Sequence, residues 1–297
     1  MSSSSVLYDH PGPRARIRNA VLSVVFGVGL VGLLWWIYSK FDEAGQWEGR
    51  LWKPFTETAT WTQFILPGLG ATLQAAAVGM LLSLAFGLLF AVGRLSERRW
   101  ISVPAGAIVE FFRAVPLLLM IFFVFYGVPF LIKGPVTAFW AVVIGLTLYN
   151  GSVLAEAFRA GVRSVPGGQS EAAYAIGMRK SQVMQLILLP QAARAMLPII
   201  VSQLVVLLKD TALGYIVAYP ELLQRSVNDL SANYGNIIAA AMVVAVIYIV
   251  INSLLTALAG WLERRTGSQR IRVPKQTRSR TVDSTPEGGA TVSEPQG

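Results

Sequence analysis

Six long apolar stretches constrain the fold of this chain more than any other feature of its sequence. A helix needs about 20 apolar residues to cross a hydrocarbon core about 30 Å thick, and a soluble core could not absorb so many such stretches. Only 14% of the residues are charged, against about 25% in soluble domains. We therefore predict an all-α membrane protein with six transmembrane helices. The expected spans are about 20–38, 66–93, 103–129, 136–158, 193–216 and 236–262.

The residue composition also excludes several classes of chemistry. The chain has no cysteine, and its one histidine is His10, in the polar N-terminal stretch. Without thiols there is no disulfide or thiolate metal site, and a catalytic triad or a histidine metal site needs an imidazole inside a folded site. An enzyme is therefore the least favoured class. We expect no catalytic residue, no metal site and no cofactor bound by this chain.

The segments outside the main spans differ in character. Residues 1–19 form a cytoplasmic tail before the first span, 20–38, which is too long for a signal peptide and has no cleavage site after it. Residues 39–65 carry charges of both signs and three tryptophans, which favour membrane interfaces, so we expect an external interfacial segment. Residues 263–297 have almost no large apolar side chains and are predicted to be a disordered cytoplasmic tail.

The distribution of basic residues sets the expected orientation. With both termini in the cytoplasm, 18 of the 25 Lys and Arg residues lie inside and 5 lie outside, which is the bias that membrane proteins show. Because these charges gather at helix ends, the net charge of +9 indicates a membrane surface rather than nucleic acid. We expect a multi-pass protein of the plasma or inner membrane, in contact with lipid and without a nucleic-acid partner.

The loop between the fourth and fifth spans, about 159–190, is too polar to cross a bilayer and is expected to face the cytoplasm. Its pattern predicts two short helices. Ser170 is placed to cap a helix that starts at Glu171, and Gly177 is suited to end that helix because glycine tolerates a positive φ. Ser181 is expected to cap the second helix, which returns the chain to the membrane.

Seven positions of this loop follow a fixed spacing: Glu-Ala-Ala, three residues, Gly, nine residues, Ile, one residue, Leu-Pro. The pattern resembles the EAA loop of ABC importer permeases. This resemblance implies that the loop docks on a separate ATPase, with Glu171 in polar contact, the two alanines permitting close approach and Gly177 forming the turn. An ordinary helical hairpin between two spans is the alternative. The matching residues are Glu171, Ala172, Ala173, Gly177, Ile187, Leu189 and Pro190.

The same resemblance implies a fold and a set of partners. It covers about 66–262 and implies the five-helix, MetI-like core of such importers, so that 20–38 is an extra N-terminal helix. The chain has no GxxxxGK[ST] phosphate loop, so ATP and Mg²⁺ are expected on cytoplasmic ATPase subunits. The further partners are an extracellular substrate-binding protein and a second permease subunit, with a sister protein preferred over an identical copy.

Charged side chains also lie within the expected spans, where they are costly and mark pathways or pairings. Glu110 and Arg113 share one helical face and can pair with each other, whereas Lys209 and Asp210 are adjacent and cannot share a face. The segments EFFRAVPLLL and LKDTAL resemble those of the polar amino acid branch of the family, which carries histidine, glutamine or glutamate. Structural ion pairs, or positions at the membrane interface, are the alternatives. The candidate pathway residues are Glu110, Arg113, Glu156, Lys209, Asp210 and Thr211.

Taken together, the resemblance implies the transmembrane permease of an ATP-driven importer for a polar amino acid, with glutamate favoured. An ion-coupled secondary transporter is the main alternative, but it predicts inverted repeats, which the sequence does not display. A membrane scaffold is a third class, and it would need no charged residues within its spans.

Overall fold

The computed structural model describes residues 12–266, and all regular structure in that part of the chain is helical. Five helices or helical runs are long and apolar enough to cross a membrane, and a bent pair makes a sixth. The prediction of an all-α protein with six apolar spans is therefore confirmed. The five unbroken spans are Pro13–Glu43, Thr58–Arg94, Ala138–Ser164, Lys180–Val217 and Ile237–Trp261.

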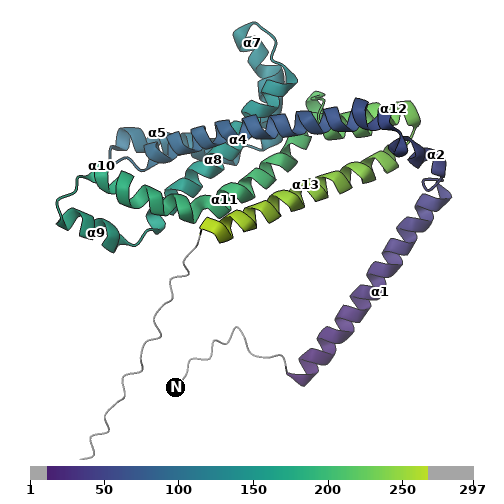
Figure 1. Ribbon diagram of the computed structural model, residues 1–297, viewed down its shortest axis with the longest axis horizontal. Coiled ribbons are helices and arrows are strands. Elements are labelled where there is room, and N and C mark those ends of the chain that lie inside the picture. The colour runs from purple at the N-terminus through teal and green to yellow at the C-terminus, as the bar shows by residue number, and fades with distance from the viewer. Residues whose placement is uncertain (1–11, 267–297) are drawn as a thin grey trace, which may run out of the picture.

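Four long helices form a bundle in which the chain runs back and forth along one axis (Figure 1). They are α4 (Leu66–Arg94), α8 (Ala138–Ser164), α11 (Leu189–Asp210) and α13 (Ile237–Thr266). One end of the bundle, called the α9 end, holds α9 (Gly167–Ala175), α10 (Lys180–Gln182) and the π-helix η5 (Val183–Leu188). The opposite end, called the α12 end, holds α2 (Gly49–Trp52), η2 (Lys53–Thr56), α3 (Thr58–Thr60), η3 (Trp61–Ile65), η7 (Gln224–Asp229) and α12 (Leu230–Tyr234). The 3-10 helix η6 (Thr211–Val217) continues α11 toward the α12 end.

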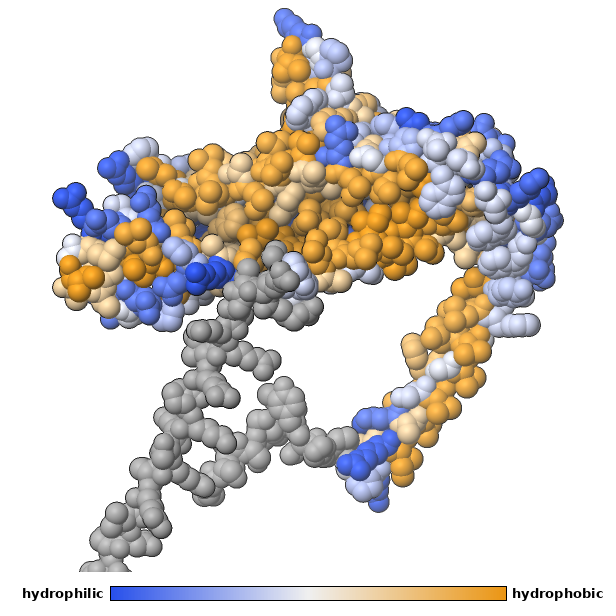
Figure 2. All heavy atoms as spheres, viewed as in Figure 1, coloured by the Kyte–Doolittle hydropathy of each residue, from blue (hydrophilic) through white to orange (hydrophobic). Residues whose placement is uncertain are grey.

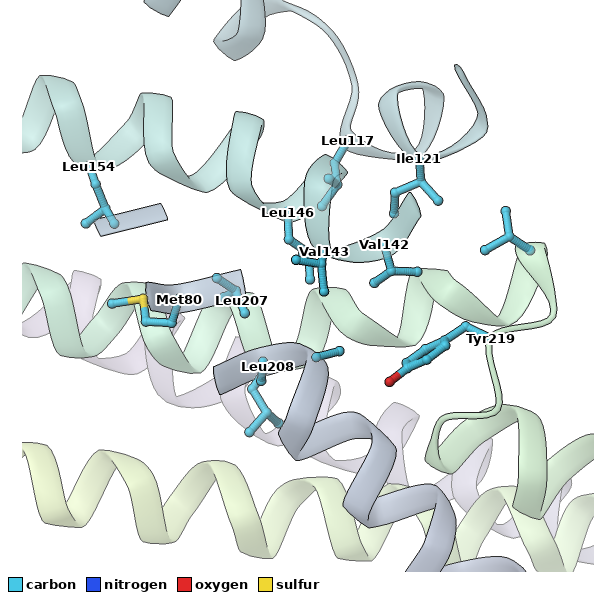
Figure 3. Close-up of a cluster of buried hydrophobic side chains, with 13 residues drawn as sticks. Met80, Leu117, Ile121, Val142, Val143, Leu146, Leu154, Leu207, Leu208 and Tyr219 are labelled. Carbon is cyan, nitrogen blue, oxygen red and sulfur yellow. The ribbon is translucent and has the colours of Figure 1, made fainter. Parts of the chain in front are cut away.

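Helix α8 is the centre of the bundle, because it packs against α4, α5, α6 and α11. Glycines let α8 and α4 approach closely: a Cβ added to Gly87 would lie 2.8 Å from Leu154 Cβ, and one added to Gly151 would lie 2.8 Å from Phe86 Cδ1. Small residues at such contacts are typical of helix packing in membranes. The core around them is apolar (Figure 3). Its buried side chains include Met80, Leu117, Ile121, Val142, Val143, Leu146, Leu154, Leu207, Leu208 and Tyr219.

The third apolar stretch does not form one straight span. Helix α5 (Arg99–Ala114) is followed by a second helical run, Leu117–Ile132, which turns away from it by 100°. Pro116 explains the break, since the residue before a proline avoids the α conformation, and Val115 is extended with a ψ of 129°. The prediction of one continuous helix over 103–129 is therefore wrong. The second run consists of α6 (Leu117–Phe122), the π-helix η4 (Phe123–Gly127) and α7 (Val128–Ile132).

The outer part of this second run stands out from the bundle as an arm (Figure 1). Leu117 and Ile121 anchor its first turn in the core, whereas Phe130 is 85% exposed near its tip. An apolar surface of this kind indicates contact with lipid or with another protein. The exposed side chains of the arm are Phe123, Tyr126, Phe130, Leu131 and Ile132.

Helix α1 (Pro13–Glu43) lies apart from the bundle and buries none of its residues (Figures 1 and 2). It is longer at both ends than the expected span 20–38. The segment after it is attached to the bundle at the α12 end, where Asn236 Nδ2 donates to Leu51 O at 2.9 Å. Stacked aromatic rings line this attachment, and such rings are enriched at membrane–water interfaces. The ring pairs are Tyr38 with Trp47 and Trp47 with Trp52.

The surface of the bundle is apolar along its length and hydrophilic at both ends (Figure 2). This is the pattern of a protein that crosses a bilayer along the bundle axis. Helix α13 continues to Thr266, past the expected start of the C-terminal tail at 263. The rest of the predicted disordered tail, 267–297, and most of the predicted N-terminal tail, 1–11, lie outside the described residues.

Candidate functional site

The loop between α8 and α11 forms a helical hairpin at the α9 end (Figure 1). Its first helix begins earlier than expected. Pro166 holds Val165 extended, which ends α8 and lets α9 start directly after the proline, at Gly167. Ser170 lies inside this helix, and its Oγ donates to Gly167 O at 2.8 Å. The prediction that Ser170 caps a helix beginning at Glu171 is therefore wrong.

Gly177 ends the first helix, as predicted. Its φ is +83°, a conformation that side chains other than glycine adopt at a cost. The Gly177 N–H donates to Tyr174 O at 2.9 Å, and the Met178 N–H donates to Ala173 O at 3.1 Å. These two bonds satisfy carbonyl groups left open by the helix end. A Cβ added at Gly177 would meet no atom within 4 Å, so only the backbone conformation requires glycine.

The second helix begins one residue before the expected cap. Ser181 lies within α10 (Lys180–Gln182), and Arg179 precedes the first helical residue. The Gln182 side chain reaches back and accepts the Arg179 N–H at 2.8 Å. This is half of a capping box, and it shows that Gln182, rather than Ser181, fixes the start of the helix. The prediction for Ser181 is therefore wrong.

The residues of the EAA pattern differ in exposure. Glu171 and Ala172 are exposed, whereas Ala173 is 4% exposed and packs inside the hairpin. Ile187 and Leu189 are half-buried and Pro190 is exposed. Four exposed apolar side chains of the first helix and its end form a surface that we call the α9 knob. They are Ala172, Tyr174, Ala175 and Ile176.

The hairpin also contacts the turn that joins α4 to α5. Lys180 Nζ forms an ion pair with Glu97 Oε1. Both side chains are at least half exposed, and such surface pairs contribute about 0–1 kcal/mol. The ion pair therefore orients the hairpin without holding it rigidly.

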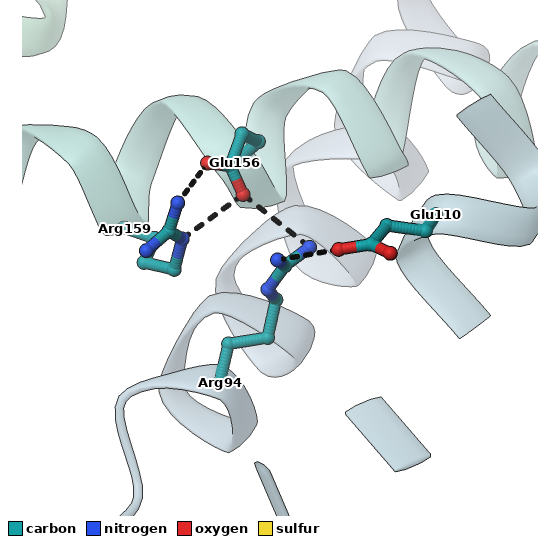
Figure 4. Close-up of polar contacts among 4 residues, drawn as sticks. All are labelled: Arg94, Glu110, Glu156 and Arg159. Atoms are coloured by element: carbon teal, nitrogen blue, oxygen red, sulfur yellow. Dashed lines mark hydrogen bonds and ion pairs between the residues drawn. The ribbon is translucent and has the colours of Figure 1, made fainter. Parts of the chain in front are cut away.

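Four charged side chains from three helices form a cluster near the α9 end of the bundle (Figure 4). Arg94, the last residue of α4, lies at its centre. Its Nη2 donates to Glu110 Oε1 of α5 at 3.1 Å, and its Nη1 lies 3.3 Å from Glu156 Oε2 of α8. Arg159 Nε donates to the same Glu156 oxygen at 3.0 Å. Arg94 is only 12% exposed, so the cluster joins three helices at a partly buried point.

This cluster contradicts the expected pairing of Glu110 with Arg113, and it adds Arg94 to the candidate functional residues. Glu110 pairs with Arg94, and no Glu110 to Arg113 ion pair occurs among residues 12–266, so the expected pairing within α5 is wrong. Sequence reasoning missed Arg94 because a basic residue directly after an apolar span predicts only a position at the membrane interface. The available signal was that Arg94, at the end of the second span, and the charges of the third and fourth spans are all expected near the cytoplasmic side of the membrane.

The remaining candidate pathway residues lie toward the other end of the bundle. Lys209 and Asp210 end α11, which starts at the α9 end. Lys209 is exposed and Asp210 is half-buried, and neither forms an ion pair within the described part of the chain. Thr211 is fully buried, and its Oγ1 donates to Leu208 O at 2.7 Å. The six candidates therefore form two groups at different depths.

Comparison with known proteins identifies the protein family to which this chain belongs. Residues 83–268 match the family model of the binding-protein-dependent transport system inner membrane component. The chain therefore belongs to this family of ABC transporter permeases. It is a transport component rather than an enzyme, and its relatives give no support to an ion-coupled secondary transporter.

Among its relatives, the chain is similar to permeases of amino acid transporters. The glutamate transport system permease protein GluD of Corynebacterium glutamicum is 45% identical over 230 residues, covering 77% of this chain and 84% of GluD. The probable glutamine ABC transporter permease protein GlnP of Bacillus subtilis is 37% identical over 205 residues, covering 68% of this chain and 93% of GlnP.

A solved amino acid ABC transporter with histidines matches with a TM-score of 0.67 at 26% identity, covering 71% of this chain and 98% of that one. The MetNI methionine transporter, at 20% identity, matches with a TM-score of 0.58 and supports the fold alone, covering 71% of this chain and 99% of that one. The expected MetI-like fold is confirmed.

Proposed function

We propose that this chain forms the membrane pathway of an importer for a polar amino acid, with glutamate as the favoured substrate. The observation that supports glutamate as the substrate is the 45% identity to GluD over 77% of the chain. The segments that hold Glu110, Arg113 and Lys209 belong to the stretch shared with the family.

The energy for transport comes, in this proposal, from a separate ATPase that binds ATP and Mg²⁺ and docks on the α9 knob. Ile176 is 78% exposed and Tyr174 is 48% exposed, and an apolar surface rimmed by polar groups is typical of a protein contact site. Glu171 adds an exposed carboxylate beside them. The α9 end then faces the cytoplasm, with both termini on that side.

A second permease subunit, with a sister protein preferred, completes the pathway beside the arm. An apolar groove lies between the arm and η6, and a partner helix seated there would cover the exposed tip of the arm. An extracellular substrate-binding protein delivers the amino acid at the α12 end. The groove is lined by Phe122, Phe123, Tyr126, Gly127, Phe130 and Ile216.

The two groups of charged side chains receive different roles. Lys209 and Asp210 line the pathway near its external half, beside the buried Thr211. There the Lys209 ammonium has no ion-pair partner among the described residues and can meet a substrate carboxylate. Glu110, Arg113 and Glu156 lie at its cytoplasmic end. There the Arg94 cluster holds α4, α5 and α8 together.

The test is reconstitution of the purified complex in proteoliposomes, with its ATPase, its second permease and its binding protein. We expect ATP-dependent uptake of radiolabelled glutamate, and Lys209→Ala should reduce it while leaving the composition of the complex unchanged. Lys209→Arg, which keeps the charge, is the matched control. Uptake at the full rate without the ATPase, or with Lys209→Ala, would contradict the proposal.

A further inference from the structure

The connection between α11 and α13 contains a carboxylate that solvent does not reach. Glu221 has 0% exposure, and burying an ionised carboxylate is costly unless its oxygens are hydrogen-bonded. Glu221 Oε2 accepts the Leu223 N–H at 2.8 Å and Oε1 accepts the Gln224 N–H at 2.7 Å. The Tyr248 O–H of α13 donates to Oε2 at 3.0 Å. Burial raises the pKa of Glu221, while these three hydrogen bonds oppose that shift.

The arrangement suits a carboxyl group, which offers two acceptor oxygens. Each oxygen of Glu221 accepts a backbone N–H. A carboxamide offers only one acceptor oxygen, and a glutamine here would leave one buried N–H without a partner. Sequence reasoning missed this residue because its neighbours come from three separate segments.

The same connection is fixed to α4 on its other side. The Leu222 N–H donates to Thr72 Oγ1 at 3.0 Å, and Tyr219 O–H donates to Ala71 O at 2.8 Å. A Cβ added to Gly68 would lie 2.9 Å from Leu222 Cα. Glu221 therefore holds a segment that is pressed closely between α4 and α13.

Tyr248 links this carboxylate to the pathway segment. The side chains of Thr72 and Thr211 lie next to the Tyr248 hydroxyl. Tyr248 also lines a groove together with Lys209 and Ala212. Tyr248 thus bonds the buried Glu221 and lies beside the segment that carries Lys209, Asp210 and Thr211.

We propose that Glu221, acting through Tyr248, is the positioning residue that sets the conformation of the 209–211 segment for transport. The proposal rests on the proposed function in taking this segment as part of the pathway. It assigns to the α11–α13 connection a role in aligning Lys209 with the substrate, beyond covering the end of the bundle.

The transport test compares three single substitutions in the reconstituted complex. Glu221→Gln and Tyr248→Phe should each lower the maximal rate of ATP-dependent uptake about tenfold, the scale expected for losing a hydrogen bond to a charged group. Tyr219→Phe is the matched control, because it removes the hydroxyl of a tyrosine in the connection itself but leaves the hydrogen bonds of Glu221 intact. It should change uptake less than twofold. Equal losses for the two tyrosine variants would indicate a merely structural role and overturn the proposal.

A second readout does not depend on transport. The chain has no native cysteine, so Lys209→Cys introduces a single thiol whose rate of alkylation by a maleimide reports its surroundings. Adding Tyr248→Phe or Glu221→Gln should change this rate at least threefold, and adding Tyr219→Phe should not. An unchanged alkylation rate with both Tyr248→Phe and Glu221→Gln would overturn the proposal, even if the wild-type complex transported no glutamate. If Glu221→Gln fails to assemble, Tyr248→Phe alone decides.

Discussion

At the α9 end of the bundle Glu171 and Lys180 are exposed to solvent, whereas at the α12 end Glu221 and Asn236 are completely buried. Both oxygens of Glu221 and the amide nitrogen of Asn236 find hydrogen-bond partners within this chain, so contacts of the chain itself fix the connection between α11 and α13. Within the described part of the chain, the ion pair between the hairpin and the α4–α5 turn joins two side chains that are at least half exposed. The position of the hairpin is therefore open to control by a docking partner.

Arg94 is the exception at the α9 end, and removing it should give the largest effect. Arg94→Met leaves the Glu156 carboxylate, which is 24% exposed, with Arg159 as its only ion-pair partner among the described residues. We expect the free energy of unfolding to fall by about 1–3 kcal/mol, because the largely buried Arg94 loses a hydrogen bond between charged groups. Thermal unfolding in detergent measures it.

The control for this change is Arg163→Met, at an exposed arginine that lines the same cleft as Arg94. Surface substitutions of this type change stability by about 0.5 kcal/mol or less. Equal losses of stability for the two variants would show that the cluster does not join the helices as its geometry indicates.

Two glycines provide a matched comparison of the two ends. Gly177 and Gly235 have φ values of +83° and +65°, and an added Cβ at either would meet no atom within 4 Å. Alanine at each position should therefore introduce the same backbone strain, about 1–2 kcal/mol. Gly177→Ala should lower ATP-dependent uptake severalfold, because it changes the angle at which the α9 knob is presented. Gly235→Ala should leave uptake within twofold. Equal effects on uptake would remove the functional distinction between the ends.

The smallest effect is expected from the ion pair between Glu97 and Lys180. Glu97→Lys should lower coupled uptake by no more than a few fold, since exposed pairs contribute about 0–1 kcal/mol. Combining it with Lys180→Glu restores the opposite charges and should restore the uptake rate. A double variant that transports no better than Glu97→Lys would show that the pair does not orient the hairpin.

The parts of the fold that the sequence predicts are those fixed by local chemistry. Span length and hydropathy locate the helices, and the positive φ that ends α9 needs glycine at 177. Pro116 is a local signal for the bend in the third span. Hydropathy averaged over the whole apolar stretch does not register this one residue. The start of α9 was misplaced because Pro166 competes with Ser170 and determines where the helix begins.

The contacts between distant residues could not be predicted in this way. Arg94 pairs with Glu110 and Glu156, which lie on other helices, and nothing in the local sequence around Arg94 distinguishes it from an ordinary flanking residue. Glu221 is similar, because its burial depends on Tyr248 of α13, which bonds it, and on Thr72 of α4, which bonds the neighbouring Leu222. Such pairings follow from the packing of the bundle rather than from sequence spacing.

The central claim is that the α9 knob faces the cytoplasm and receives the motion of an ATPase. Because the chain has no cysteine, Ala172→Cys and Ala232→Cys place single thiols on exposed positions at opposite ends of the bundle. The account predicts that a membrane-impermeant maleimide labels the first only in inside-out vesicles and the second only in right-side-out vesicles, and that only the first cross-links to the ATPase. Labelling of the Ala172→Cys thiol from outside, or ATP-driven uptake without any such cross-link, would contradict it.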